Sequence, residues 1–528
     1  MALRLTGRSD GARFLISFPC SARKARTEDF ILTQYHFAAL VLIATGPLLA
    51  LSRLIRMPES LLLFAVGVLS TFIPRLPEPN IDPDLILTLF LPPLIYASTV
   101  RVSWHLLRFT LRPGVVLGTA LVLTTIGTVA LAARTVFLPG LSWTAALLIG
   151  IVASIFDTRL FHEAEGRPRV PRAIADTLKA RELVGRIFIL ATLSVVEEVL
   201  SSREVAASSV LASYGLDIPA GALIGLVVGR AAVWMRRRID PAPVEIAISI
   251  ATPYAAALSA EAAGFSVVTA VTVTALVVSA IRVDRHSGAT ISSAEARVSA
   301  VAFWDQANLM VSSALFLLAG RAVPQALAAL EAWSIWRLFL AAVGLLAIVL
   351  AIQVCFSYAA TKLPPIAGAL QRRQGEGRSH LTAAGVMAWS STRSVIALLI
   401  ALSVPAAAPT GEPFHDRDLV LIVAAFMVIG SVVVQGLSLR SIVEYAALSD
   451  PGEADQEVEE ARSAMRKASE TPDAEHASSH DAARQVLVNL RERDIIGDEV
   501  LVRMLRETDL HARAAQENAL PGAGPPQP

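Results

Sequence analysis

Four ionisable side chains stand inside long apolar segments of this sequence, where charged groups are rare. Asp157 lies in the stretch ASIFDTRLF, Glu182 and Arg186 lie in ELVGRIFILATLSVV, and Arg393 lies in AWSSTRSVIAL. A charge at the centre of a membrane helix costs roughly 2.5–3.5 kcal/mol on insertion scales. Residues of this kind are retained where they bind ions, relay protons or pair with one another. These four are therefore the first candidates for the chemistry of the protein.

The composition is that of a membrane protein. Its mean hydropathy is +0.57 and 17% of its residues are charged, against about 25% in soluble domains. Apolar runs of roughly 18 residues or more have the length of a spanning helix, and these runs lack the alternation of a barrel strand. The sequence predicts an all-α polytopic membrane protein with about thirteen spans, at about 36–55, 58–75, 83–100, 114–133, 141–161, 177–200, 208–235, 243–263, 264–283, 298–321, 334–360, 381–404 and 418–440.

Several classes of protein are excluded by what the sequence lacks. The two cysteines, Cys20 and Cys355, cannot form a disulfide scaffold or a cysteine-built metal site. The sequence contains no GxxxxGK[ST], HExxH or GxSxG motif, which are the patterns of phosphate-binding loops, zinc peptidases and serine hydrolases. We therefore expect no enzyme activity, no cofactor, no nucleic-acid partner and no metal site beyond that of a transported monovalent cation.

Charge divides the chain into three parts and orients it. Residues 1–35 are predicted to be a basic disordered leader, residues 36–440 a transmembrane domain, and residues 441–528 an acidic tail with 18 acidic and 9 basic residues. Loops on one side of the thirteen spans carry 20 arginines and lysines, and the opposite loops carry about five. Because loops rich in these residues stay in the cytoplasm, the tail is predicted to be cytoplasmic.

Two further patterns predict local structure. The segment GALIGLVVG places Gly221, Gly225 and Gly229 on one helix face, which favours close packing against another helix. In the tail, apolar residues near 483–511 fit two short amphipathic helices that form a hairpin with a break at Gly497. The Glu-, Ala- and Ser-rich residues 449–480 are predicted to be flexible.

The predicted fifth and twelfth spans share a short polar interruption, Ser-Ile-Phe-Asp-Thr in one and Ser-Ser-Thr-Arg-Ser in the other. Paired broken helices in the two halves of a membrane protein indicate inverted repeats that cross at an ion site. An aspartate at such a crossing can hold either a proton or a cation. Competition between the two ligands for Asp157 would produce exchange.

Several stretches, in their shared order, resemble the bacterial cation–proton antiporters of the sodium/proton exchanger type. FLPPLIY (90–96) is similar to the family's F-L-P-P-L-L-F, VMAWSSTRSVIALLIALSVP (386–405) is similar to W-G-G-L-R-G-A-V-S-L-A-L-A-L-S-L-P, and VQGLSL (434–439) matches the thirteenth span. The resemblance implies secondary active exchange of sodium or potassium for protons by alternating access. It also implies a homodimer in the lipid bilayer of the bacterial plasma (inner) membrane.

The ion-site motifs depart from the family pattern. Where the family reads S-P-T-D-P, this chain reads Ser-Ile-Phe-Asp-Thr over 154–158, so the aspartate is kept and both prolines are lost. Where the family reads E-G-E-S-L-L-N-D, this chain reads Lys-Ala-Arg-Glu-Leu-Val-Gly-Arg over 179–186, so the Asn-Asp pair becomes Gly185-Arg186. A shift of one residue would align Glu182 with the family's glutamate, and the second acid is missing in either alignment. The usual asparagine of the tenth span is Ser312.

The resemblance gives each candidate a predicted role. Asp157, Thr158 and Ser154 are the predicted ion-binding residues, and Arg186, Glu182, Arg393 and Ser312 are predicted to modulate the site. Arg186 has two interpretations, as a tethered cation paired with Asp157 or as a structural partner of Glu182 one helical turn earlier. For Arg393, helix organisation is favoured over direct ion contact.

Two alternative functions stay open from the sequence. The lost acids suit a degenerate family member that moves no ion and acts in regulation or sensing through its tail. They also suit a transporter of a non-cation substrate, because Arg186 and Arg393 could hold an anion.

Overall fold

Long apolar helices make up most of the chain that the structure describes. The computed structural model describes residues 41–73, 83–100, 104–157, 174–187, 213–238, 242–280, 294–330, 333–362, 380–405, 414–446, 451–469, 479–497 and 500–510, apart from one or two positions at a time within some of these ranges. Among them, six helices are long and apolar enough to cross a membrane, and five shorter apolar helices have 10–17 residues. The predicted span at 177–200 is described only in part, so the number thirteen stays a prediction.

The helices follow the predicted spans closely. They are α2 (Glu59–Ser70), α3 (Pro83–Thr99), α4 (Trp104–Ala132), α5 (Trp143–Ser154), α9 (Ile218–Arg236), α10 (Ala242–Ala262), α11 (Val267–Ala280), α12 (Ala294–Ala329), α13 (Ile335–Ala360), α15 (His380–Trp389), α16 (Val395–Ser403), α17 (Arg417–Ser431) and α18 (Leu437–Tyr445). Short π-helical turns, η1 (Ala133–Phe137), η2 (Ser213–Asp217) and η4 (Val432–Gly436), adjoin α4, α9 and α17.

The helix starts have identifiable causes in the sequence. Ser142 caps α5, because its hydroxyl accepts a hydrogen bond from the Ala145 backbone nitrogen at 3.2 Å. Ser394 caps α16 in the same way, with the Ile396 nitrogen 3.3 Å from its hydroxyl. Gly140, with a φ of 98°, makes the turn before α5, a backbone conformation that favours glycine.

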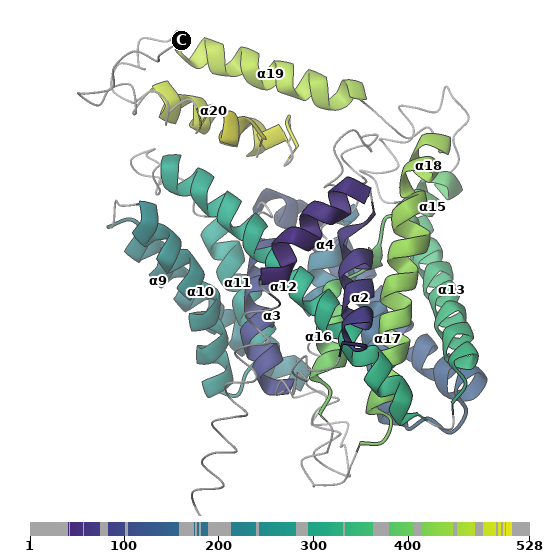
Figure 1. Ribbon diagram of the computed structural model, residues 1–528. Coiled ribbons are helices and arrows are strands. Elements are labelled where there is room, and N and C mark those ends of the chain that lie inside the picture. The colour runs from purple at the N-terminus through teal and green to yellow at the C-terminus, as the bar shows by residue number, and fades with distance from the viewer. Residues whose placement is uncertain are drawn as a thin grey trace, which may run out of the picture.

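The helices pack in two groups that share one apolar core. One group joins α9, α10 and α11 with α3, and also contains the tightly packed pair α2 and α12. The other group consists of α4, α5, α13, α15 and α17, and α16 lies between the groups in contact with α3 and α12 on one side and α5 and α17 on the other. Figure 1 shows α9 and α10 at the left of the bundle and α13 and α15 at the right.

Glycines let the backbones of two helix pairs touch. A Cβ atom added at Gly225 would lie 2.3 Å from the Ala270 carbonyl oxygen on α11. A Cβ atom at Gly320 of α12 would lie 2.2 Å from the Phe64 carbonyl oxygen on α2. The predicted close packing of the glycine face on α9 is therefore confirmed, and α2 and α12 use the same device.

Replacing Gly225 with leucine should destabilise the membrane body strongly. Overpacked cores lose about 1–3 kcal/mol, and here the obstructing atom belongs to backbone that cannot move aside, so we expect at least that loss. Gly127→Leu on α4 is the matched control, because nothing lies within 4 Å of a Cβ atom there. Thermal unfolding in detergent measures both. Equal midpoints for the two variants would contradict the close helix contact.

The tail forms a small helical unit with its own core. Helices α19 (Pro451–Ser469) and α20 (Ser479–Glu492) lie side by side across the top of the membrane body in Figure 1. Together with the helical turns after residue 500 they bury a cluster that consists of Val458, Ala461, Leu487, Ile496, Val500, Leu501 and Met504. Glu457 on α19 also accepts a hydrogen bond from the Gly497 backbone nitrogen at 2.7 Å.

The prediction of a flexible segment over 449–480 was wrong for residues 451–469, which form α19. The polar composition of this segment conceals an apolar face, because Val458, Ala461 and Met465 recur at helical spacing and pack into the tail core. Basic residues in its last turn, Arg466 and Lys467, also favour the helix dipole. Gly497 lies between α20 and the helical turns after residue 500, as the sequence predicts.

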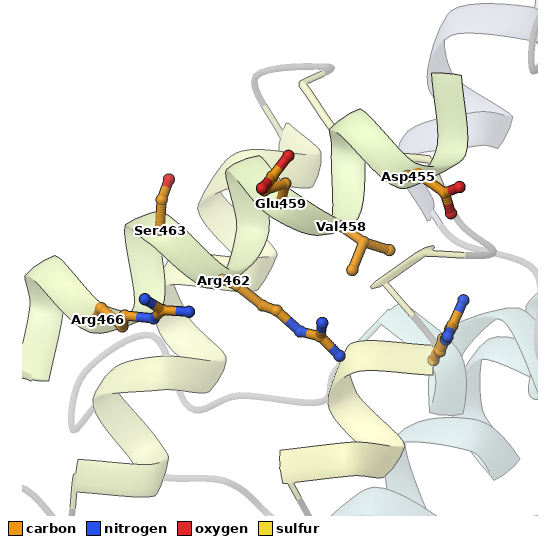
Figure 2. Close-up of a pocket in the computed structure, with 7 residues that line it drawn as sticks. Asp455, Val458, Glu459, Arg462, Ser463 and Arg466 are labelled. Carbon is orange, nitrogen blue, oxygen red and sulfur yellow. The ribbon is translucent and has the colours of Figure 1, made fainter. Parts of the chain in front are cut away.

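A solvent-facing cleft of about 510 Å³ runs along α19, and Figure 2 shows the side chains on its walls. Its lining is Asp455, Val458, Glu459, Arg462, Ser463, Arg466 and Arg503. Arg462 also pairs with Glu507 at 3.2 Å. The walls carry both acidic and basic side chains, so the cleft favours neither an anionic nor a cationic ligand.

Deleting residues 449–528 should leave the membrane body folded. The buried cluster of the tail shares no residue with the buried clusters of the body, and α18 packs with α15 before the deletion begins. We expect expression level and thermal midpoint close to those of the full chain, measured by fluorescence-detected gel filtration. Failure of the shortened chain to insert in the membrane would instead make the tail a structural part of the body.

Candidate ion-binding site

Two short extended segments pair with each other inside the membrane body. The strand β1 (Phe156–Asp157) follows the end of α5, and β2 (Thr392–Arg393) separates α15 from α16. They run antiparallel, with Phe156 opposite Arg393 and Asp157 opposite Thr392. All four residues are buried, which suits the rule that non-helical backbone at membrane depth must be covered by protein.

The pairing places Asp157 beside the break in the predicted twelfth span. Asp157 is only 6% exposed, and its backbone carbonyl accepts a hydrogen bond from the Thr392 hydroxyl at 3.1 Å. Ser154 donates its hydroxyl to the Ile151 carbonyl of its own helix at 2.7 Å. Residues 158–173, which include Thr158, lie outside the described residues. The predicted crossing of two broken helices therefore stays a prediction on the side of the fifth span.

Arg186 contacts both carboxylates that the sequence offered as its partners. Its Nη2 atom bonds the Glu182 carboxylate and lies 3.9 Å from Oδ2 of Asp157. Its Nη1 atom donates to the hydroxyl of Ser98 on α3 at 2.6 Å. The pairing with Asp157 and the pairing with Glu182 are therefore both present, and Glu182 is the closer partner.

Arg393 joins the end of α5 to the β2 segment. Its guanidinium donates to the carbonyls of Ala153 and Ser391, and its backbone nitrogen donates to the Ser431 hydroxyl at 2.9 Å. The last carbonyls of a helix have no partner within the helix, so a buried donor at Ala153 stabilises the point where α5 ends. This geometry favours the organising role predicted for Arg393.

Arg181 belongs to the same cluster and was missed in the sequence. It donates to the hydroxyl of Ser357 on α13 at 3.1 Å and to that of Ser391 at 2.6 Å, and its guanidinium lies 4.9 Å from the centre of the Phe156 ring. The signal was present, since Arg181 falls inside the predicted span 177–200. The rule that selected Arg186 there would also have selected Arg181.

The cluster carries more positive than negative charge. Among the described residues, three buried arginines (Arg181, Arg186 and Arg393) stand with two buried carboxylates (Asp157 and Glu182). Charge interactions are strong where water is excluded, and an unpaired buried charge is costly. The position of Arg186 between both carboxylates lowers that cost.

Other charged or polar candidates lie elsewhere in the fold. Ser312 is half-buried on α12, and none of the hydrogen bonds described for the cluster reaches it. Asp305 on the same helix is exposed. An ion pair that the sequence did not reveal joins the half-buried Arg236 of α9 to the buried Glu245 of α10, at 3.5 Å.

Comparisons with known proteins agree with the fold. Residues 39–445 match the family model described as the transmembrane sodium/hydrogen exchanger. An uncharacterised Na⁺/H⁺ exchanger of Mycobacterium tuberculosis is 29% identical over 401 residues, which are 75% of this chain and 71% of that protein. The Na⁺/H⁺ antiporter NhaH of Halobacillus dabanensis is 24% identical over 77% of this chain and 96% of its own length.

A solved structure gives the fold directly. The sodium proton antiporter MjNhaP1 from Methanocaldococcus jannaschii superposes with a TM-score of 0.58 and 15% identity, over 80% of this chain and 100% of that one. The relatives are transporters and not enzymes, in keeping with the absence of enzyme motifs. The family model covers well over half of the 528 residues. This multi-pass membrane protein therefore belongs to the sodium/hydrogen exchanger family.

Proposed function

We propose that this chain exchanges a monovalent cation, sodium or potassium, for protons by alternating access, with Asp157 as the carrier residue. The observation that carries the proposal is the buried carboxylate of Asp157 at the pairing of β1 with β2. Relatives named as Na⁺/H⁺ antiporters, including NhaH and the NhaS2 protein of Synechocystis, support the choice of ions.

The local backbone suits a cation at this point. The carboxyl-terminal ends of α5 and α15 meet at the paired segments, and each helix end contributes a partial negative charge. A single carboxylate binds a proton or a cation and not both, so occupancy by one ligand excludes the other. Ser154 and Thr158, on either side of Asp157 in sequence, are the proposed neighbours of the ion.

Alternating access needs two bodies that move against each other, and the packing offers them. The group formed by α4, α5, α13, α15 and α17 holds Asp157 and Arg393, while α9, α10 and α11 pack with α3 in the other group. We take the first group as the part that carries the ion site. The transported ion reaches one side of the membrane or the other as the two groups shift.

The setting of the protein is part of the same proposal. We place it in the bacterial plasma membrane as a homodimer, with the acidic tail in the cytoplasm. The 20 arginines and lysines on one side of the predicted spans support this orientation. That count covers only loops between the predicted spans, and residues 1–35 lie outside both the count and the described part of the chain.

The experiment is proton movement in inverted membrane vesicles that contain the full chain, followed with a pH-sensitive dye. Sodium, potassium and lithium chloride are added in turn after a proton gradient is formed. Proton release on addition of at least one cation is expected, and vesicles without the protein give the background. A folded, inserted protein that gives background signals with all three ions would refute the exchange function.

A further inference from the structure

We propose that Asp157, Glu182 and Ser98 form a monovalent-cation site, and that the Arg186 guanidinium occupies this site as an internal cation. A transported ion then has to displace Arg186 before it can bind. The inference rests on the proposed function in taking Asp157 as the carrier. It adds two ligands, Glu182 and Ser98, and gives Arg186 the role of a resident competitor.

Three oxygen-bearing side chains from three segments meet at one guanidinium. Nη2 of Arg186 contacts the carboxylates of both Glu182 and Asp157, and Nη1 donates a hydrogen bond to the Ser98 hydroxyl at 2.6 Å. Asp157 follows α5, Ser98 is on α3, and Glu182 is on the helix described over residues 181–187. Asp157, Glu182 and Arg186 are all less than 9% exposed.

The chemistry of these groups matches that of an alkali cation. Carboxylate and hydroxyl oxygens are the hard donors that such ions take in proteins, as they do for other hard cations. Two buried carboxylates also require a positive charge or a proton between them, because an uncompensated buried charge is costly. In this structure the guanidinium of Arg186 supplies that charge.

A purely structural ion pair does not account for the whole arrangement. The spacing of four residues between Glu182 and Arg186 explains their mutual contact. It does not require Nη2 to lie 3.9 Å from Asp157, nor Nη1 to bond a side chain 88 residues away. The guanidinium instead has the surroundings of a bound cation, with oxygen atoms from separate elements on several sides.

Displacement of Arg186 would also change the contact between the two helix groups. Ser98 lies on α3, which packs with α10 and α11. Residue 181 on the Arg186 helix bonds Ser357 of α13, in the other group. Leu183 on the same helix packs against Leu276 of α11, so this helix contacts both groups, and an ion that displaces the guanidinium breaks its bond to Ser98 of α3.

The test is cation-specific stabilisation of purified full-length protein, which needs no transport. Thermal unfolding in detergent is measured in sodium, potassium, lithium and choline chloride at equal ionic strength. The parent should show a smaller difference among the four salts than Arg186→Ala, because an ion must first displace the guanidinium. Arg186→Ala vacates the site, and with salt one hundredfold above the dissociation constant its midpoint should rise by about 5 °C in at least one alkali chloride relative to choline.

Two matched variants separate occupancy of the site from a general loss of charge. Arg186→Lys keeps a tethered cation and should behave like the parent. Adding Ser98→Ala to Arg186→Ala removes one proposed ligand and should raise the alkali concentration needed for stabilisation about tenfold. An unchanged concentration dependence in that double variant would remove Ser98 from the site.

The remaining outcomes also decide the matter. Arg186→Ala that is folded and equally stable in all four salts overturns the inference. If Arg186→Ala unfolds in choline, recovery by an alkali chloride supports the site, and unfolding in every salt counts against it. Failure of the parent to exchange ions in vesicles, together with new cation stabilisation in Arg186→Ala, would remove the proposed function and leave the site.

Discussion

Substituting Asp157 with asparagine should abolish cation-induced proton release in inverted vesicles. The amide keeps the size of the side chain, but it cannot take up a proton. It also carries no negative charge to balance that of a bound cation. The backbone of residue 157 still accepts its hydrogen bond from Thr392, so the protein should insert and fold. Dye response per unit of inserted protein measures the loss, which we expect to exceed tenfold for sodium, potassium and lithium alike.

Asp305→Asn is the control for that result. Asp305 is also an aspartate of the membrane body, but it is exposed on α12, and its substitution should leave the dye response near that of the parent. Undiminished exchange by Asp157→Asn would show that the carrier carboxylate is another residue. Equal losses in both variants would indicate damage to the fold and not to the ion site.

Substituting Arg393 with alanine should destabilise the membrane body even in the absence of any transported ion. The Ala153 carbonyl would lose its donor while remaining buried, whereas the Ser391 carbonyl would keep a hydrogen bond from Gln435 at 3.4 Å. A buried acceptor left without a partner costs about 1–3 kcal/mol, so we expect a loss of about that size. The thermal midpoint in choline chloride measures this loss, and transport should fall with the amount of folded protein.

Arg53→Ala is the control for loss of a positive charge, because the Arg53 side chain is 80% exposed and its pair with Glu59 is 3.9 Å long. Exposed pairs of this kind contribute about 0–1 kcal/mol. An Arg393→Ala protein with the parent's midpoint, but with altered preference among sodium, potassium and lithium, would contradict the organising role. Arg393 would then be a group that contacts the ion.

The sequence predicted the helices and the candidate residues better than it predicted their contacts. Apolar length alone placed the spans, and α5 and α9 to α13 follow them within a few residues at most ends. The charge rule found Asp157, Glu182, Arg186 and Arg393, and the structure brings all four into one cluster. Both results follow from the high cost of polar groups in hydrocarbon, which is a local property of the sequence.

The contacts depend on tertiary structure and could not be derived in the same way. Nothing local to Phe156 and Asp157 specifies that they pair with Thr392 and Arg393. Spacing on one helix predicted the bond between Arg186 and Glu182, but the third partner, Ser98, lies on another helix. The helix α19 was missed because its apolar face is sparse within a highly charged segment.

The pairing of β1 with β2 has a consequence for how the protein is made. The bond from the Thr392 hydroxyl to the Asp157 carbonyl joins residues 235 positions apart. Contacts of such long sequence separation form late, after the chain between them has been ordered, and domains begin to fold during synthesis from the N-terminus. A nascent chain that has not yet reached residue 392 holds Asp157 without its opposite strand, so the pairing that buries the Asp157 backbone is completed only near the end of membrane insertion.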